Sequence, residues 1–130
     1  MVPPVNVLRN GFVNKIPDEL SFEAATLSEP LACCINGHRN AKIVDGDTVV
    51  IYGAGAIGCF HIILAKLMGA GKVFVIDNVA ERLLTVERFK PDRIIDYSTE
   101  NTVEVIKREA PLGANVVFTC APSKIAQEEA

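Results

Sequence analysis

A glycine-rich turn between a buried strand and an apolar helix constrains the fold of this chain more than any other feature. Residues 48–52, TVVIY, are a short continuous run of β-branched and apolar side chains, which is typical of a strand buried on both faces. GAGAIG at 53–58 follows at once, and 59–68, CFHIILAKLM, is long and apolar enough for a buried helix. This order predicts the first unit of a parallel α/β fold.

The rest of the chain repeats this alternation. The pattern predicts further strands and helices at 72–77, 79–89, 93–97, 102–110, 115–119 and from 122 onward. Strands alternating with helices indicate right-handed βαβ units and a parallel sheet. The predicted fold class is therefore α/β, a Rossmann-type doubly wound parallel sheet of about four strands with helices on both faces. Because a complete sheet of this kind has about six strands, we expect a fragment or an isolated domain.

The sequence divides into three predicted parts. Residues 1–20 are rich in Pro and Asn and are predicted to be an extended lead-in. Residues 21–44 form a helical segment, in which Ser21 is the expected N-cap and Pro30 the expected first residue of a second helical piece. Residues 45–130 form the partial Rossmann domain.

Composition excludes several classes of protein. The chain has 130 residues, of which 49% are hydrophobic and 22% charged, and a formal net charge of −3, which argues against disorder. No stretch is dominated by Lys or Arg, so no nucleic-acid partner is expected. No apolar run approaches the roughly 18–20 residues of a membrane span, and the N-terminus lacks the layout of a signal peptide. We therefore expect a soluble, cytoplasmic protein without a membrane partner.

The four cysteines fit that location. Cys33 and Cys34 are adjacent, while Cys59 and Cys120 stand alone, so no CxxC pair offers zinc or redox chemistry. Three of the four sit in apolar stretches (LACCI, IGCFHII and VVFTCA), where a cysteine is usually a small buried hydrophobe. Reduced thiols are usual in the cytoplasm.

The glycine turn is the first candidate site, because its context makes GxGxxG specific for a dinucleotide. Gly53 allows the tight turn, Gly55 lets a pyrophosphate approach the backbone, and Gly58 allows close helix packing. Backbone N–H groups of Gly55, Ala56 and Ile57 are expected to face the phosphates, helped by the helix dipole. A glycine turn that merely packs well is the alternative.

Asp77 is the second candidate. It ends the second predicted strand, roughly 20 residues after the last glycine, where a carboxylate binds an adenosine ribose. A carboxylate would repel a 2′-phosphate, so NAD is favoured over NADP. A strand-end aspartate that caps the next helix is the alternative, and one residue can do both. From the motif alone, Arg82 is a solvated helix residue.

Four stretches resemble the zinc-dependent medium-chain dehydrogenases of the alcohol dehydrogenase superfamily. They are SEPLAC at 28–33, DGDTVVIYGAGAIG at 45–58, KVFVID at 72–77 and GANVVFTCA at 113–121. The sorbitol (polyol) and threonine dehydrogenases are the nearest branch. The resemblance runs along the whole chain, which is well under half of a typical member, and it places residues 21–44 on the substrate-domain side.

The resemblance implies roles for individual residues. Ile57 would pack near the nicotinamide side of the dinucleotide, and Arg82 would reach the adenosine ribose. Glu29 would sit beside the catalytic zinc, as a ligand or through its water, which makes it the candidate catalytic and metal-binding residue. Cys120, at the end of the stretch GANVVFTCA, is a further cofactor-binding candidate.

This sequence also departs from the family. The principal zinc ligands of such enzymes, a cysteine and a His-Glu pair, are expected in a substrate domain before Met1, and the four-cysteine zinc lobe is absent from this sequence. His61 is instead predicted to be a hydrogen-bonded core residue, and His38 to lie near a surface turn. Because catalytic zinc needs three protein ligands, we expect this chain alone to be inactive.

The leading interpretation is the NAD-binding portion of a zinc-dependent alcohol or polyol dehydrogenase, which transfers hydride between a secondary alcohol and NAD. Its expected partners are a small alcohol or polyol and, at full length, further copies of itself. A non-catalytic NAD-binding module and an S-adenosylmethionine-dependent methyltransferase are the alternatives. Titration with NAD and S-adenosylmethionine would test the methyltransferase, and alcohol oxidation by the full-length protein would separate the other two.

Overall fold

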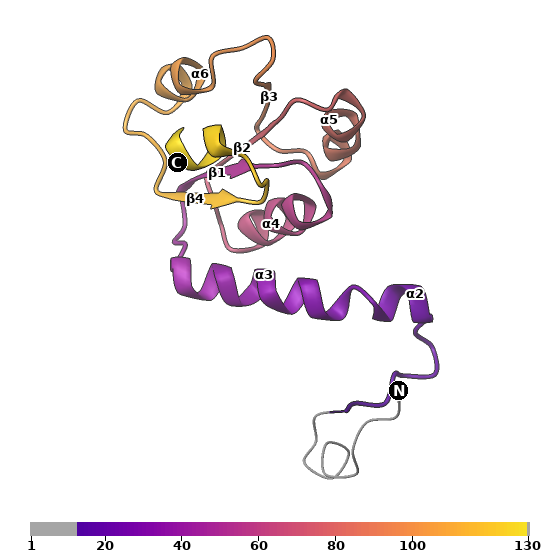
Figure 1. Cartoon of the computed structure of the whole chain (residues 1–130). Coiled ribbons are helices and arrows are strands. Elements are labelled where there is room, and N and C mark those ends of the chain that lie inside the picture. Colours follow the sequence, from indigo (N-terminus) through magenta and orange to yellow (C-terminus); the bar gives the residue numbers. More distant parts are fainter. Residues whose placement is uncertain (1–12, 130) are drawn as a thin grey trace.

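The computed structural model describes residues 13–129, so the prediction for residues 1–12 lies outside the described part of the chain. The elements alternate as expected (Figure 1). They are α2 Phe22–Ala25, α3 Ser28–Ala41, β1 Thr48–Tyr52, α4 Ala56–Leu67, β2 Lys72–Asp77, α5 Ala80–Val86, the 3₁₀ helix η1 Glu87–Phe89, β3 Arg93–Asp96, α6 Thr102–Glu109, β4 Val116–Thr119 and α7 Lys124–Glu129. Between residues 13 and 129, none of the helices has the length and apolar character that crossing a bilayer requires.

The four strands form one parallel sheet in the order β3-β2-β1-β4. Successive strands first add on one side of β1, and the chain then returns to add β4 on the other side. This reversal is the switch point of a doubly wound fold, and it opens a crevice at the carboxyl ends of the strands. The predicted Rossmann-type sheet is confirmed.

Helices cover both faces of the sheet, as predicted. Successive strand residues point to opposite faces, and here both faces are buried. Val50, Phe74 and Ile76 lie on the face covered by α6 and α7. Val49 and Val75 lie on the opposite face, which α4 and α5 cover. Figure 1 shows the two layers, with α3 beyond α4 on the outside of the molecule.

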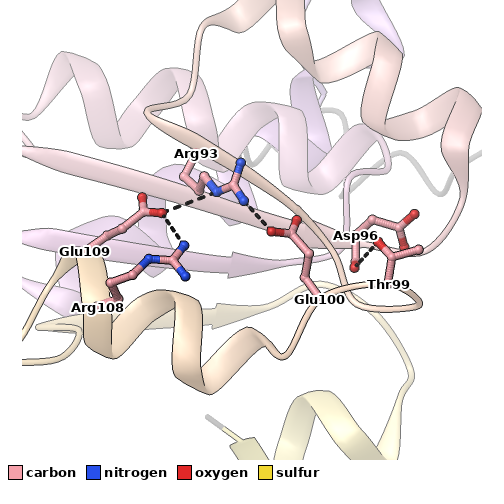
Figure 2. Close-up of polar contacts among 6 residues, drawn as sticks. All are labelled: Arg93, Asp96, Thr99, Glu100, Arg108 and Glu109. Carbon is pink, nitrogen blue, oxygen red and sulfur yellow. Dashed lines mark hydrogen bonds and ion pairs between the residues drawn. The ribbon is translucent and has the colours of Figure 1, made fainter.

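An ionic network ties the edge strand β3 to α6 (Figure 2). The Arg93 guanidinium pairs with Glu100, and its Nε lies 3.6 Å from Oε1 of Glu109. Arg108 approaches the same Glu109 oxygen at 3.0 Å. At the end of β3, the Thr99 hydroxyl donates to the carbonyl oxygen of Asp96.

The helical segment before the sheet differs in detail from its prediction. Ser21 caps α2 as expected, since its Oγ accepts from the N–H of Ala24. However, α3 begins at Ser28, so Pro30 is its third residue and not its first. The N–H groups of the whole first turn have no partner within the helix, so a proline is tolerated at each of these positions.

His38 does not lie near a surface turn; that prediction is wrong. Its side chain is 1% exposed and lies within α3. Gly37 precedes it and has no side chain, so α3 comes close to α4 and β4: a Cβ at Gly37 would lie 3.7 Å from His61 and 3.8 Å from Phe118. His61 is a hydrogen-bonded core residue, as predicted.

Candidate functional site

The turn after β1 requires glycine at its first position. Gly53 has a φ of +109°, a backbone conformation that residues with a side chain rarely adopt. A Cβ there would also lie 3.0 Å from the carbonyl carbon of Cys120. The Gly53 N–H donates to the carbonyl of Ile76 at 2.7 Å, which ties the turn to the end of β2.

Gly58 and Gly55 are glycines for different reasons. A Cβ at Gly58 would lie 1.9 Å from the carbonyl oxygen of Gly53, so a side chain would push α4 off the turn. A Cβ at Gly55 would meet no atom within 4 Å, and the φ of Gly55 is an ordinary −76°. Neither packing nor backbone strain explains Gly55. The open space beside its backbone fits a ligand that approaches closely.

The amino end of α4 presents donors to this space. Cys59 has the first backbone N–H of α4 that donates to a preceding carbonyl; it donates to the carbonyl of Gly55 at 2.9 Å. Within the described part of the chain, no hydrogen bond occupies the amides of Ala56, Ile57 and Gly58. Unoccupied N–H groups at the positive end of a helix favour an anion such as a phosphate.

Asp77 lies at the end of β2, opposite the glycine turn. Its Oδ2 accepts from the N–H of Ala54 at 2.8 Å, and its Oδ1 accepts from the N–H groups of Asn78 and Val79. Burial by itself would raise the pKa of Asp77, but these donors and Arg82 more than offset it and lower the pKa. The carboxylate is therefore ionised at neutral pH.

The bonds of Asp77 bear on both of its predicted roles. It holds the turn before α5 and also the glycine turn, so it has a structural role. Two carboxylate oxygens can accept about four hydrogen bonds, and the backbone donors occupy three of these positions. Oδ2 therefore keeps capacity for a ligand hydroxyl. The guanidinium Nη1 of Arg82 lies 3.7 Å from the same oxygen.

A cavity of about 190 Å³ opens at this edge of the sheet. Three of the predicted site residues, Gly53, Asp77 and Arg82, line it together, while residues 55–58 and Cys120 do not. Sequence reasoning missed the other lining residues, which are Tyr52, Ile76, Asn78, Tyr97, Ala121, Pro122, Ser123, Ala126 and Glu129. Three of them, Tyr52, Asn78 and Tyr97, end a strand or directly follow one. The rule that parallel strands end at one edge would have found these three.

Cys120 lies beneath the glycine turn. Its N–H donates to the carbonyl of Tyr52 at 2.7 Å, and its own backbone packs against Gly53. Burial, and to a lesser degree Cys34, raises the pKa of the Cys120 thiol to about 12. The thiol is therefore neutral and packs as a small apolar group. Its assignment to the cofactor site stays a prediction.

Glu29 is exposed in the first turn of α3, away from the residues that line the cavity. Its Oε1 accepts from the thiol of Cys33 at 3.2 Å, and this bond and the charge of Glu29 raise the pKa of that thiol. Cys33 is exposed, whereas Cys34 is buried and Cys59 and Cys120 are partly buried. Among residues 13–129, no three His, Cys, Asp or Glu side chains are grouped to hold a metal. These residues alone do not fit a catalytic zinc.

Comparison with known proteins identifies the family. The model of a family described as zinc-binding dehydrogenase matches residues 56–130. The chain belongs to the zinc-binding dehydrogenase family. A sorbitol dehydrogenase from Ovis aries is 38% identical over 110 residues, which are 84% of this chain and 31% of that protein. This zinc-binding dehydrogenase chain thus spans about a third of the length of the curated relatives that it matches.

Solved structures of other dehydrogenases share the fold of this family member. The alcohol dehydrogenase TADH from Thermus sp. ATN1 is 27% identical with a TM-score of 0.80, over 88% of this chain and 34% of that one. A short chain alcohol dehydrogenase (rspB) from E. coli CFT073, solved with NADH, is 26% identical with a TM-score of 0.76, over 89% of this chain and 35% of that one.

Proposed function

We propose that this chain is the NAD-binding portion of a zinc-dependent alcohol or polyol dehydrogenase that transfers hydride between a secondary alcohol and NAD. The observation that carries the proposal is the open space at Gly55, which no packing contact requires, at the amino end of α4. The relatives of this chain include a sorbitol dehydrogenase, and one of its structural neighbours was solved with NADH. When bound, NAD accepts the hydride.

The residues of this chain would bind and orient that cofactor. The amides of Gly55, Ala56 and Ile57 would donate to the pyrophosphate, which could approach because Gly55 has no Cβ. The unused acceptor position of Asp77 would take a ribose hydroxyl, and Arg82 would contact the same sugar. This arrangement favours NAD over NADP, since the ionised Asp77 would repel a 2′-phosphate.

Glu29 is the proposed oxygen ligand of zinc, directly or through water. The described residues cannot hold the metal by themselves, so the remaining ligands would have to come from elsewhere. A non-catalytic NAD-binding module is therefore the second candidate. Alcohol oxidation by the full-length protein would separate the two.

The proposed substrate is a small alcohol or polyol. We also propose a cytoplasmic location, which four free thiols support, and a homo-oligomer at full length. Among the described strands β4 is an edge of the sheet, and an edge strand can pair with another chain.

Calorimetric titration of the chain with NAD and with S-adenosylmethionine tests the proposal. We expect NAD to bind and S-adenosylmethionine not to bind. In Gly55→Ala the methyl group occupies the phosphate approach, so the Kd for NAD should rise at least about tenfold, or about 1.4 kcal/mol. The thermal midpoint should stay unchanged.

Gly37→Ala is the matched control, because its Cβ would make only ordinary contacts. Unchanged NAD affinity in Gly55→Ala would contradict the phosphate role of the turn. Binding of S-adenosylmethionine in place of NAD would overturn the proposed function.

A further inference from the structure

Two buried histidines form a pair that the proposed cofactor site does not use. His38 of α3 and His61 of α4 are 1% and 7% exposed. Nε2 of His38 lies 2.9 Å from Nδ1 of His61. Both rings pack on Phe118 of β4, at centroid distances of 4.5 and 4.1 Å. The pair therefore joins three elements that are far apart in the sequence.

The hydrogen bond needs one donor and one acceptor, so both imidazoles must be neutral or only one charged. Among residues 13–129, Nδ1 of His38 has no hydrogen-bond partner. A buried N–H without a partner is rarer than a buried acceptor without one, so this nitrogen carries no proton and Nε2 donates to His61. Protonating His38 would then place an unpaired, charged N–H in the core. Protonating His61 at Nδ1 would break the bond between the rings.

α3 packs along α4, but few of its side chains are fully buried. Of its 14 residues only Cys34 and His38 are buried, and Figure 1 places the helix outside α4. In the described part of the chain no three ligating side chains are grouped here for a metal. Among the hydrogen bonds of the described residues, the pair is the one that joins a side chain of α3 to a side chain of α4.

Within the described part of the chain, no charged side chain compensates the pair. The charged residues Glu29 and Arg39 of α3 and Lys66 of α4 are exposed. The charge of Arg88 on η1 lowers the pKa of the Cys59 thiol. The neighbouring thiols, Cys34 on α3, Cys59 on α4 and Cys120 after β4, have pKa values raised chiefly by burial and stay neutral in acid.

We propose that the His38–His61 pair is an acid-sensitive joint, which holds α3 against α4 and β4 at neutral pH and releases α3 when the imidazoles gain protons. The released state is α3 detached with the sheet still folded.

The direction of the pH effect follows from linkage. Burial lowers the pKa of His38, and burial together with the neighbouring His38 lowers the pKa of His61 to about 4. A released imidazole takes up its proton near the ordinary value of about 6.5. The joint therefore contributes its full stability above about pH 6.5 and loses it as the pH falls toward 4.

The joint lies between the two proposed sites, since α3 begins near Glu29 and α4 begins at the glycine turn. It would fix Glu29 relative to the cofactor. This consequence rests on the proposed function, but the joint itself does not.

Hydrogen exchange of the 130-residue chain at pH 7 and pH 5, corrected for intrinsic rates, tests the joint. One released imidazole predicts that opening of α3 increases roughly twentyfold at pH 5. The amides of β1 and β2 should keep their protection. Unchanged exchange in α3, or equal loss of protection in α3 and the strands, would overturn the proposal. NAD is not required, so the result is independent of the proposed function.

Two variants sharpen the test. His38→Leu/His61→Leu keeps an apolar contact without titratable groups, so exchange of its α3 should be equal at both pH values. Arg39→Gln, an exposed change on the same helix, should keep the response of the unmodified chain. A pH response that persists in the double variant would contradict the joint.

NMR titration of the unmodified chain covers the case in which the double variant does not fold. The chain has two histidines, so their imidazole signals are readily assigned. Both midpoints should lie below the ordinary value of about 6.5. Midpoints at the ordinary value would overturn the proposal.

Discussion

At the scale of single residues, three glycines that look equivalent in GAGAIG meet three different physical requirements. Gly53 supplies a positive φ, Gly58 supplies room for a carbonyl oxygen, and Gly55 leaves space that no protein atom uses. Only the last of these points to a ligand. Folding and binding can therefore be separated by substitutions within one turn.

Gly58→Ala should destabilise the fold. The new methyl group would meet a backbone oxygen at 1.9 Å, which neither α4 nor the turn can avoid without moving. Overpacking of this kind costs about 1–3 kcal/mol. Urea denaturation measures the loss, and Gly37→Ala is again the control. A free energy of unfolding equal to that of the unmodified chain would show that the turn relaxes freely.

Asp77→Ala should lower the preference for NAD over NADP. The substitution removes the charge that would repel a 2′-phosphate, so the ratio of the two affinities should shift by about tenfold, or about 1.4 kcal/mol. It also removes an acceptor from three backbone amides, so stability should fall. The ratio of the NAD and NADP affinities, measured by titration, is insensitive to that loss of stability. If this ratio does not change, Asp77 has only the structural role.

At the scale of elements, the edge strand β3 depends on side chains as well as on its single neighbour. β3 pairs with β2 alone, and Arg93 at its first position connects it to two glutamates. Arg93 and these partners are about one-third exposed, which limits the energy of the network.

Arg93→Met should cost about 1 kcal/mol of stability, because it keeps the aliphatic stem and removes only the ion pairs. Chemical denaturation at low and high salt measures it, and the cost should shrink at high salt. Lys15→Met removes an exposed pair with Asp18 and is the control. A cost that does not depend on salt would mean that packing dominates over charge.

At the scale of the whole molecule, the cavity combines residues from the carboxyl ends of several strands. Tyr52 ends β1, Asp77 ends β2 and Tyr97 follows β3, while Pro122 and Ser123 follow β4. This convergence fits a binding site. The same described residues offer no grouped metal ligands. They therefore supply a candidate binding site but not a metal centre for catalysis.

The purified 130-residue chain should therefore bind NAD but lack dehydrogenase activity, even with added zinc. Glu29 alone cannot hold the metal that would polarise an alcohol. Absorbance of NADH during incubation with a polyol measures this, with a complete dehydrogenase as the positive control. Steady production of NADH would refute the expectation.

Sequence reasoning predicted most of the fold and only part of the site. The strand runs and the glycine turn depend on residues that are close in the chain, so their patterns are readable. The helix predicted over residues 79–89 is divided in the structure: the α-helix α5 ends at Val86, and the 3₁₀ helix η1 follows it. Ser123 and Ala126 carry no such signal, because only the tertiary structure brings them to the cavity.

The sequence by itself determined the α/β alternation, the glycine turn and the carboxylate at the end of β2, since local periodicity and backbone sterics decide these. The tertiary structure alone decided that His38 is buried against His61 and Phe118, and that Asp77 bonds the glycine turn. These contacts join segments far apart in the chain. They form because both faces of the sheet must be covered and because buried polar groups need partners.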